Sequence, residues 1–163
     1  MQRPWFKYDP VDDESFFDSA PFRLQGKFEV ARPAAEVWEE IAADGTLWWC
    51  RILDDIEWTS PRPFGVGTTR TARALHGLNV LHEKFFIWEE GRRMSFYVLE
   101  ASAPLARRFA EDYVVEPISD GSCRFTWTIA SEPRWPALKV LDPGNSRLLK
   151  TLFTDTARHY GSA

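Results

Sequence analysis

The sequence predicts an α+β domain, in which a seven-stranded antiparallel sheet packs against one long helix near the C-terminal end. Three observations lead to this class. Residues 52–130 fall into segments that alternate apolar and polar side chains and are separated by short turns. Residues 148–160 carry an apolar stripe with helical spacing. The 163 residues suffice for one domain with its own core and would be cramped for two.

The first strand and the segment after it carry clear local signals. Phe22–Val30 alternates between an apolar and a polar face, which is typical of a half-buried strand. Residues 34–43 follow Pro33 and have helical spacing, with Trp38 on the apolar side. Thr46 can cap a second short helix that holds Leu47, Trp48 and Trp49. We therefore expect two short helices after the first strand.

Six further strands are expected at residues 52–59, 68–75, 79–89, 92–101, 107–118 and 122–130, separated by glycine and proline signals. The sequence does not show which face of the strand at 79–89 points to the interior, because both of its faces mix polar and apolar side chains. His82 therefore faces the interior in one phase and the solvent in the other.

The last helix is expected from Pro143 to Tyr160, with Asp142 as its cap. Its apolar stripe comprises Leu141, Leu148, Leu149, Leu152, Phe153, Thr156 and Tyr160. An antiparallel sheet needs one covered face, and only this helix is long enough to cover it.

Residues 1–20 form an N-terminal extension to a domain that spans residues 21–163. Prolines break any regular element there, and acidic residues alternate with aromatic ones. The extension is either a semi-ordered tail or a strap docked on the domain. Because exposed aromatic rings are unfavourable, we expect at least some of Trp5, Phe6, Phe16 and Phe17 to be docked.

The hairpin around Asp120-Gly121 indicates which side chains of its strands share a face. An odd number of loop residues puts Glu111 on the apolar face, whereas an even number puts Asp112 and Glu116 there. We favour Glu111, because its set includes the bulky Phe109, Tyr113, Phe125 and Trp127. A carboxyl group on that face needs a raised pKa or a cationic partner. The candidate partners are Arg70, Arg73, Arg107 and His82.

Composition and missing motifs exclude several functions. The net charge of −4, without a long basic run, argues against nucleic-acid binding, and no apolar run is long enough for a membrane span. Two cysteines and no signal-peptide pattern lead us to expect a cytoplasmic protein with reduced thiols. The three histidines lack metal-ligand spacing, and Gly65-Val66-Gly67 is no dinucleotide loop. We expect neither a metal nor another cofactor.

The order of elements and several local sequences resemble the START/Bet v 1-like superfamily, and within it the polyketide cyclase/dehydrase and lipid-transport group. The matching segments are Phe28–Trp38, Gly65–Arg70, Glu83–Arg93, Tyr113–Pro117 and Arg124–Thr128. A minor departure is Glu90-Gly91, where the family usually has prolines. The resemblance implies a helix-grip fold, with the sheet curved around the last helix and a cavity for a hydrophobic ligand between them.

The resemblance also implies site residues. The residues expected to bind the ligand are Trp38, Arg70, His82, Phe96, Tyr97, Glu111, Tyr113, Phe125, Trp127, Leu149, Leu152 and Phe153. The first functional hypothesis is a monomer or homodimer that binds a lipid- or polyketide-like molecule. The second is an aromatase/cyclase-type enzyme with Glu111, Arg70 and Tyr113 as candidate catalytic residues. The third is a co-chaperone-like interaction module with a filled interior.

Overall fold

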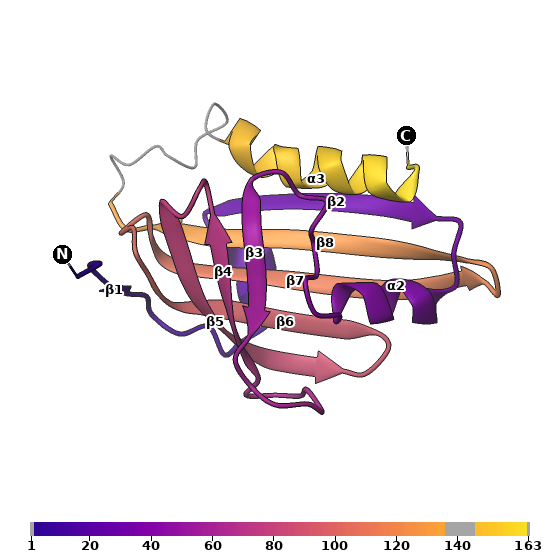
Figure 1. Ribbon diagram of the computed structural model, residues 1–163, viewed down its shortest axis with the longest axis horizontal. Coiled ribbons are helices and arrows are strands. Elements are labelled where there is room, and N and C mark those ends of the chain that lie inside the picture. Colours follow the sequence, from indigo (N-terminus) through magenta and orange to yellow (C-terminus); the bar gives the residue numbers. More distant parts are fainter. Residues whose placement is uncertain (1, 136–145, 163) are drawn as a thin grey trace.

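A curved antiparallel sheet forms the body of the protein, and one helix lies along one of its faces (Figure 1). The computed structural model describes residues 2–135 and 146–162. The elements in chain order are β1 (Phe6–Lys7), α1 (Phe16–Ser19), β2 (Phe22–Val30), α2 (Ala34–Ile41), β3 (Leu53–Trp58), β4 (Thr69–Ala74), β5 (Asn79–Glu89), β6 (Arg93–Ala101), β7 (Ala106–Ser119), β8 (Ser122–Pro133) and α3 (Ser146–Tyr160).

The seven long strands have the order β2-β8-β7-β6-β5-β4-β3, and every neighbouring pair is antiparallel. This confirms the predicted fold class and places all seven predicted strands. Strands β3 to β8 are neighbours in chain order, whereas β2 pairs with β8 from the other end of the chain. That long-range pairing brings the first strand beside the last.

The second of the two predicted helices after β2 is wrong. Residues 46–49 form turns, and the short helices early in the chain are α1 and α2. Gly45 and Leu47 have φ angles of 67° and 60°, in the left-handed region, which a right-handed helix cannot contain. At the other end, the predicted cap Asp142, with Pro143 and Leu141, lies outside the described residues.

Helix α3 packs closely on β2 and β8. Phe153 contacts Phe28 and Trp127, with ring centroids 6.2 and 5.5 Å apart. Gly26 permits this approach, because a Cβ atom there would lie 2.8 Å from Phe28 Cζ and 3.0 Å from Phe153 Cγ. Leu152 and Tyr160 are buried in the same core, whereas Leu148 is 44% exposed.

The N-terminal residues cover the opposite face of the sheet. Val11, Phe16 and Phe17 are buried in a cluster with Ala110 of β7 and Ala130 of β8. This confirms the prediction that some of the N-terminal aromatic rings dock on the domain. We call the face toward α3 the inner face of the sheet and the face toward α1 the outer face.

The N-terminal residues also fill a gap within the sheet. β6 and β7 pair only between Arg93–Tyr97 and Ala110–Val114, and then separate. Residues 6–9 enter this gap, since the Tyr8 amide donates to Leu99 of β6 (2.9 Å) and the Asp9 amide to Arg107 of β7 (2.7 Å). The Tyr8 side chain is thereby buried.

The β7–β8 hairpin puts Glu111 on the inner face, as predicted, but for a different reason. Its loop is the two-residue turn Asp120-Gly121, which by itself would turn Asp112 inward. A bulge at Ile118 adds one residue to β7 and restores the pairing of Glu111 with Ile129. Residues 111, 113, 125 and 127 therefore share the inner face.

Candidate ligand-binding site

A cavity of about 160 Å³ lies between the inner face of the sheet and the first turns of α3. Most of its lining is aliphatic, and it includes Leu149 and Leu152 from α3. The remaining lining residues are Tyr8, Ile52, Leu53, Ala72, Ala74, Leu75, Asn79, Leu81, Glu83, Leu105, Ala106, Phe109, Glu111 and Leu148. The side chains thus come from both ends of the chain and from the middle strands.

Glu111 of β7 is one of two carboxyl groups that line this cavity. Its Oε2 atom accepts hydrogen bonds from the Trp127 indole (2.8 Å) and the Tyr113 hydroxyl (3.0 Å). Its Oε1 atom has no hydrogen-bond partner within the described residues. The carboxyl group is therefore held in position through one oxygen, and the other is without a partner in the described part of the chain.

Glu83 of β5 is the second carboxyl group. It pairs with Arg70 of β4, whose Nε lies 2.5 Å from Glu83 Oε2, and both side chains are almost fully buried. The other carboxyl oxygen, Oε1, makes no hydrogen bond in the described part of the chain. Glu83 thus resembles Glu111 in presenting one unpaired oxygen.

Arg70 lies behind the cavity wall and is not among its lining residues. Its Nη2 atom donates to the Tyr113 hydroxyl (3.3 Å), and its guanidinium lies 4.3 Å from the centre of the Phe96 ring and 5.2 Å from that of Phe85. Nη1 has no hydrogen-bond partner within residues 2–135 and 146–162. The aromatic rings take the place of that partner, since a guanidinium is attracted to a ring face.

Burial raises the pKa of Glu111 to about 7, and the nearby Glu83 adds to the rise. Arg70 and the hydrogen bonds from Trp127 and Tyr113 act in the opposite direction. Burial also raises the pKa of Glu83, although Arg70 opposes that shift. Glu111 therefore changes its charge near neutral pH.

The predicted site residues fall into four groups. Glu111, Leu149 and Leu152 line the cavity. Six others lie in the core around it without lining it, namely Arg70, Phe96, Tyr113, Phe125, Trp127 and Phe153. Trp38 lies farther away, where its indole donates to Glu90 (2.9 Å) and packs edge-on against Trp88.

His82 and Tyr97 lie on the outer side of the sheet. The His82 ring stacks on Trp5, 4.3 Å between centroids, and its Nδ1 lies 3.0 Å from Glu100 Oε1. Tyr97 packs against Phe86 in the cluster that the N-terminal residues cover. Neither side chain reaches the cavity.

Sequence reasoning missed the importance of Glu83, because it could not decide which face of strand β5 points inward. A bulge between Phe85 and Ile87 explains the difficulty. Leu81, Glu83 and Phe85 face inward by strict alternation, but after the bulge Trp88 faces inward as well. The pairing of an acidic with a basic residue on neighbouring predicted strands was the one signal available.

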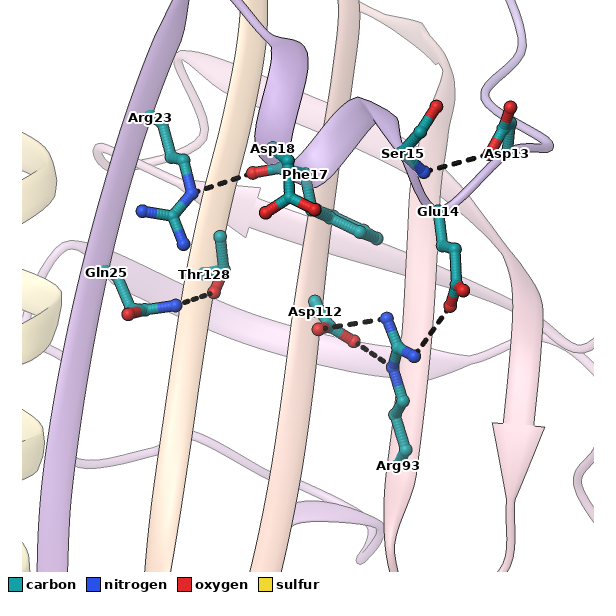
Figure 2. Close-up of a pocket in the computed structure, with 10 residues that line it drawn as sticks. All are labelled: Asp13, Glu14, Ser15, Phe17, Asp18, Arg23, Gln25, Arg93, Asp112 and Thr128. Atoms are coloured by element: carbon teal, nitrogen blue, oxygen red, sulfur yellow. Dashed lines mark hydrogen bonds and ion pairs between the residues drawn. The ribbon is translucent and has the colours of Figure 1, made fainter.

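A larger depression, of about 490 Å³, lies on the outer face between the N-terminal residues and the sheet (Figure 2). Its lining is polar, and both of its arginines are already engaged. Arg93 bridges Asp112 and Glu14, each at 2.8 Å, and the Arg23 side chain donates to the Phe17 carbonyl (2.7 Å). These contacts hold the N-terminal residues on the sheet, so we assign this depression a structural role.

Comparisons with known proteins agree with this architecture. A family model described as polyketide cyclase/dehydrase and lipid transport matches residues 21–161. A protein of Mycobacterium tuberculosis, named only as uncharacterised, is 36% identical over 150 residues, which cover 89% of this chain and 88% of that protein.

Solved structures share the fold at low sequence identity. A START superfamily protein from Mycobacterium smegmatis has a TM-score of 0.65 at 14% identity, covering 86% of this chain and 97% of its own. The Zhui aromatase/cyclase of a Streptomyces species has a TM-score of 0.62 at 16% identity, covering 84% and 94%. Within the described residues, no helix is long and apolar enough to cross a bilayer.

Proposed function

The chain belongs to the polyketide cyclase/dehydrase and lipid-transport family, and we propose that it binds a small hydrophobic molecule in the cavity beneath α3. The cavity itself is the observation that carries this proposal. Protein interiors are close-packed, and an apolar void of this size is costly to maintain. An engineered apolar cavity of roughly 150 Å³ in another protein binds benzene. The 160 Å³ cavity therefore suits a ligand of about one ring.

Toluene provides the direct test. We expect saturable binding, measured by NMR chemical-shift changes of residues lining the cavity, and a rise in the melting temperature with toluene concentration. Substituting Ala72→Phe fills the cavity from β4 and is expected to abolish both effects.

A matched control for the filled cavity is Ile118→Phe, which adds a ring at an exposed hairpin position. It should leave toluene binding unchanged. Absence of binding to the folded wild-type protein would contradict the proposal, as would unchanged binding in a folded Ala72→Phe variant.

A second candidate function, acid/base catalysis on a bound ligand, is supported by Glu111. A general acid or base works best with a pKa near the working pH, and the pKa of Glu111 is raised to about 7. Its side chain lines the cavity, and its Oε1 is unpaired among the described residues. Under this hypothesis Glu111→Gln would abolish turnover while preserving ligand binding.

The third hypothesis, an interaction module, requires a filled interior and is not supported by the cavity.

A further inference from the structure

The charged groups that line the cavity are carboxyl groups, which in their ionised form only accept hydrogen bonds. The neutral Asn79 amide, which can both donate and accept, also lines it, and its buried Oδ1 has no partner among the described residues. Glu83 and Glu111 line it, and each has one carboxyl oxygen without a partner among the described residues. A ligand with a donor group would supply the partner that each of these oxygens lacks. The Tyr8 hydroxyl is already engaged, since it donates to the Ala103 carbonyl at 2.9 Å.

The charged side chains that line the cavity are negative. Its described lining contains two carboxyl groups and no Lys, Arg or His side chain. Arg70 is the nearest cation, but Glu83, Tyr113 and the ring of Phe96 surround its guanidinium. Arg70 balances Glu83, so ionised Glu111 leaves the cluster with one excess negative charge.

The dimensions of the site limit the ligand further. A volume of about 160 Å³ fits one ring with a short substituent better than a fused polycyclic molecule or a long acyl chain. Glu111 is at the polar side of this space, while Leu149 and Leu152 from α3 supply apolar contacts.

From these three properties we infer that the cavity selects a single-ring apolar molecule that carries a hydrogen-bond donor, preferentially an ammonium group, which pairs with Glu111. Carboxylates of the same size are disfavoured, because they would meet two carboxyl groups and no available cation among the described lining residues. The inference rests on the proposed function and specifies the ligand class for that same cavity.

A set of four compounds tests this selectivity on the wild-type protein at pH 8. Benzylamine, benzyl alcohol, benzoate and toluene have nearly the same size and differ in charge and hydrogen bonding. We expect affinity to decrease in the order benzylamine, benzyl alcohol, toluene, benzoate, as measured by NMR titration. Benzylamine should also bind several-fold more weakly at pH 6, where protonation removes the charge of Glu111, whereas toluene binding should not change.

Variants at two neighbouring carboxyl residues test whether Glu111 causes the preference for benzylamine. Glu111→Gln keeps the shape of the side chain and should weaken benzylamine binding about tenfold or more, the effect of losing a hydrogen bond to a charged group. Toluene binding should persist in this variant. Asp112→Asn is the matched control, since Asp112 is equally buried, both being 8% exposed, but pairs with Arg93 on the outer face. It should leave benzylamine binding to the folded protein unchanged.

The outcomes separate this inference from the proposed function. If none of the four compounds binds, the proposed function and the inference both fail. If toluene binds but benzoate binds as tightly as benzylamine at pH 8, the proposed function stands and the inference is overturned. An equal loss of benzylamine affinity in Glu111→Gln and Asp112→Asn would also overturn it. Should Glu111→Gln not fold, the wild-type order of affinities and its pH dependence decide the question.

Discussion

Glu111 and Asp112 are neighbours in sequence with the same exposed fraction, 8%, yet they have different chemical surroundings. Asp112 faces the outer side and is bound by Arg93 and by the Ser95 hydroxyl (2.6 Å). Glu111 faces inward among aromatic rings and receives two neutral donors. Because successive side chains of a strand point to opposite faces, one position decides between a paired carboxylate and one that titrates near neutral pH.

The stability of the protein should fall as the pH rises through the titration of Glu111. The pKa of Glu111 is raised from 4.5 to about 7 in the folded state, so the folded state binds the proton more tightly than the unfolded state. The resulting stabilisation is complete below about pH 4.5 and is lost as the pH approaches and passes 7. It amounts to about 3 kcal/mol.

Urea denaturation between pH 5 and pH 8 measures this loss. Glu111→Gln removes the titrating group. From pH 5 to pH 8, the free energy of unfolding of the wild type should therefore fall by about 2–3 kcal/mol more than that of the variant. Glu83 shifts in the same direction and remains in both proteins, while Arg70 and Tyr113 keep their protonation states. A difference between the two proteins that does not change with pH would contradict a raised pKa for Glu111.

Among the elements, β2 and α3 form the contact that closes the core. Gly26 of β2 lies directly beneath Phe153 of α3, and the Phe28 ring occupies the adjoining space. The missing Cβ atom allows the helix to lie close to the strand. The apolar stripe of α3 alone would not indicate how near the two elements can pack.

Gly26→Ala should therefore destabilise the protein. The added methyl group would lie 2.8 Å from Phe28 Cζ and 3.0 Å from Phe153 Cγ, so both rings must move. Overpacking of this kind costs about 1–3 kcal/mol, which thermal or urea unfolding measures. Gly121→Ala is the control, because a Cβ atom there has no neighbour within 4 Å. Equal stability of the two variants would show that α3 does not depend on the close approach at Gly26.

At the scale of the whole molecule, the sheet is covered on both faces by the two ends of the chain. Helix α3 covers the inner face, and the residues around α1 cover the outer face (Figure 1, Figure 2). Residues 6–9 connect the two sides by entering the gap between β6 and β7. Tyr8 thus lines the cavity from the N-terminal end of the chain.

Tyr8→Ala should both destabilise the protein and open the cavity. The side chain is buried, so its removal is expected to lower the free energy of unfolding by about 3 kcal/mol. Toluene should then dissociate faster, as measured by NMR exchange, because the wall between β6 and β7 is incomplete. Tyr8→Phe is the matched control, since it loses only the hydroxyl contacts with Ala103 and Ala106, worth about 1 kcal/mol, and keeps the ring. Equal dissociation rates in the two variants would exclude a role of Tyr8 as part of the wall.

The sequence by itself determined the order of the strands along the chain, the helix that covers them and the apolar inner face of β7 and β8. These features depend on local periodicity and turn residues, which each segment carries independently of the others. Phe22–Val30 and Asn79–Glu89 were predicted with the bounds that the structure has. The inward direction of Glu111 followed from the aromatic residues that share its face.

Only the tertiary structure decided which polar groups meet at the cavity. The bulges at Ile118 and after Phe85 change the face of the following residues, and a bulge leaves no distinct signal in an alternating sequence. The entry of residues 6–9 between β6 and β7 and the pairing of Arg70 with Glu83 join segments that are distant along the chain. Such contacts depend on how the strands are paired and curved, so the size, sign of charge and ligand class of the cavity emerge only in the folded molecule.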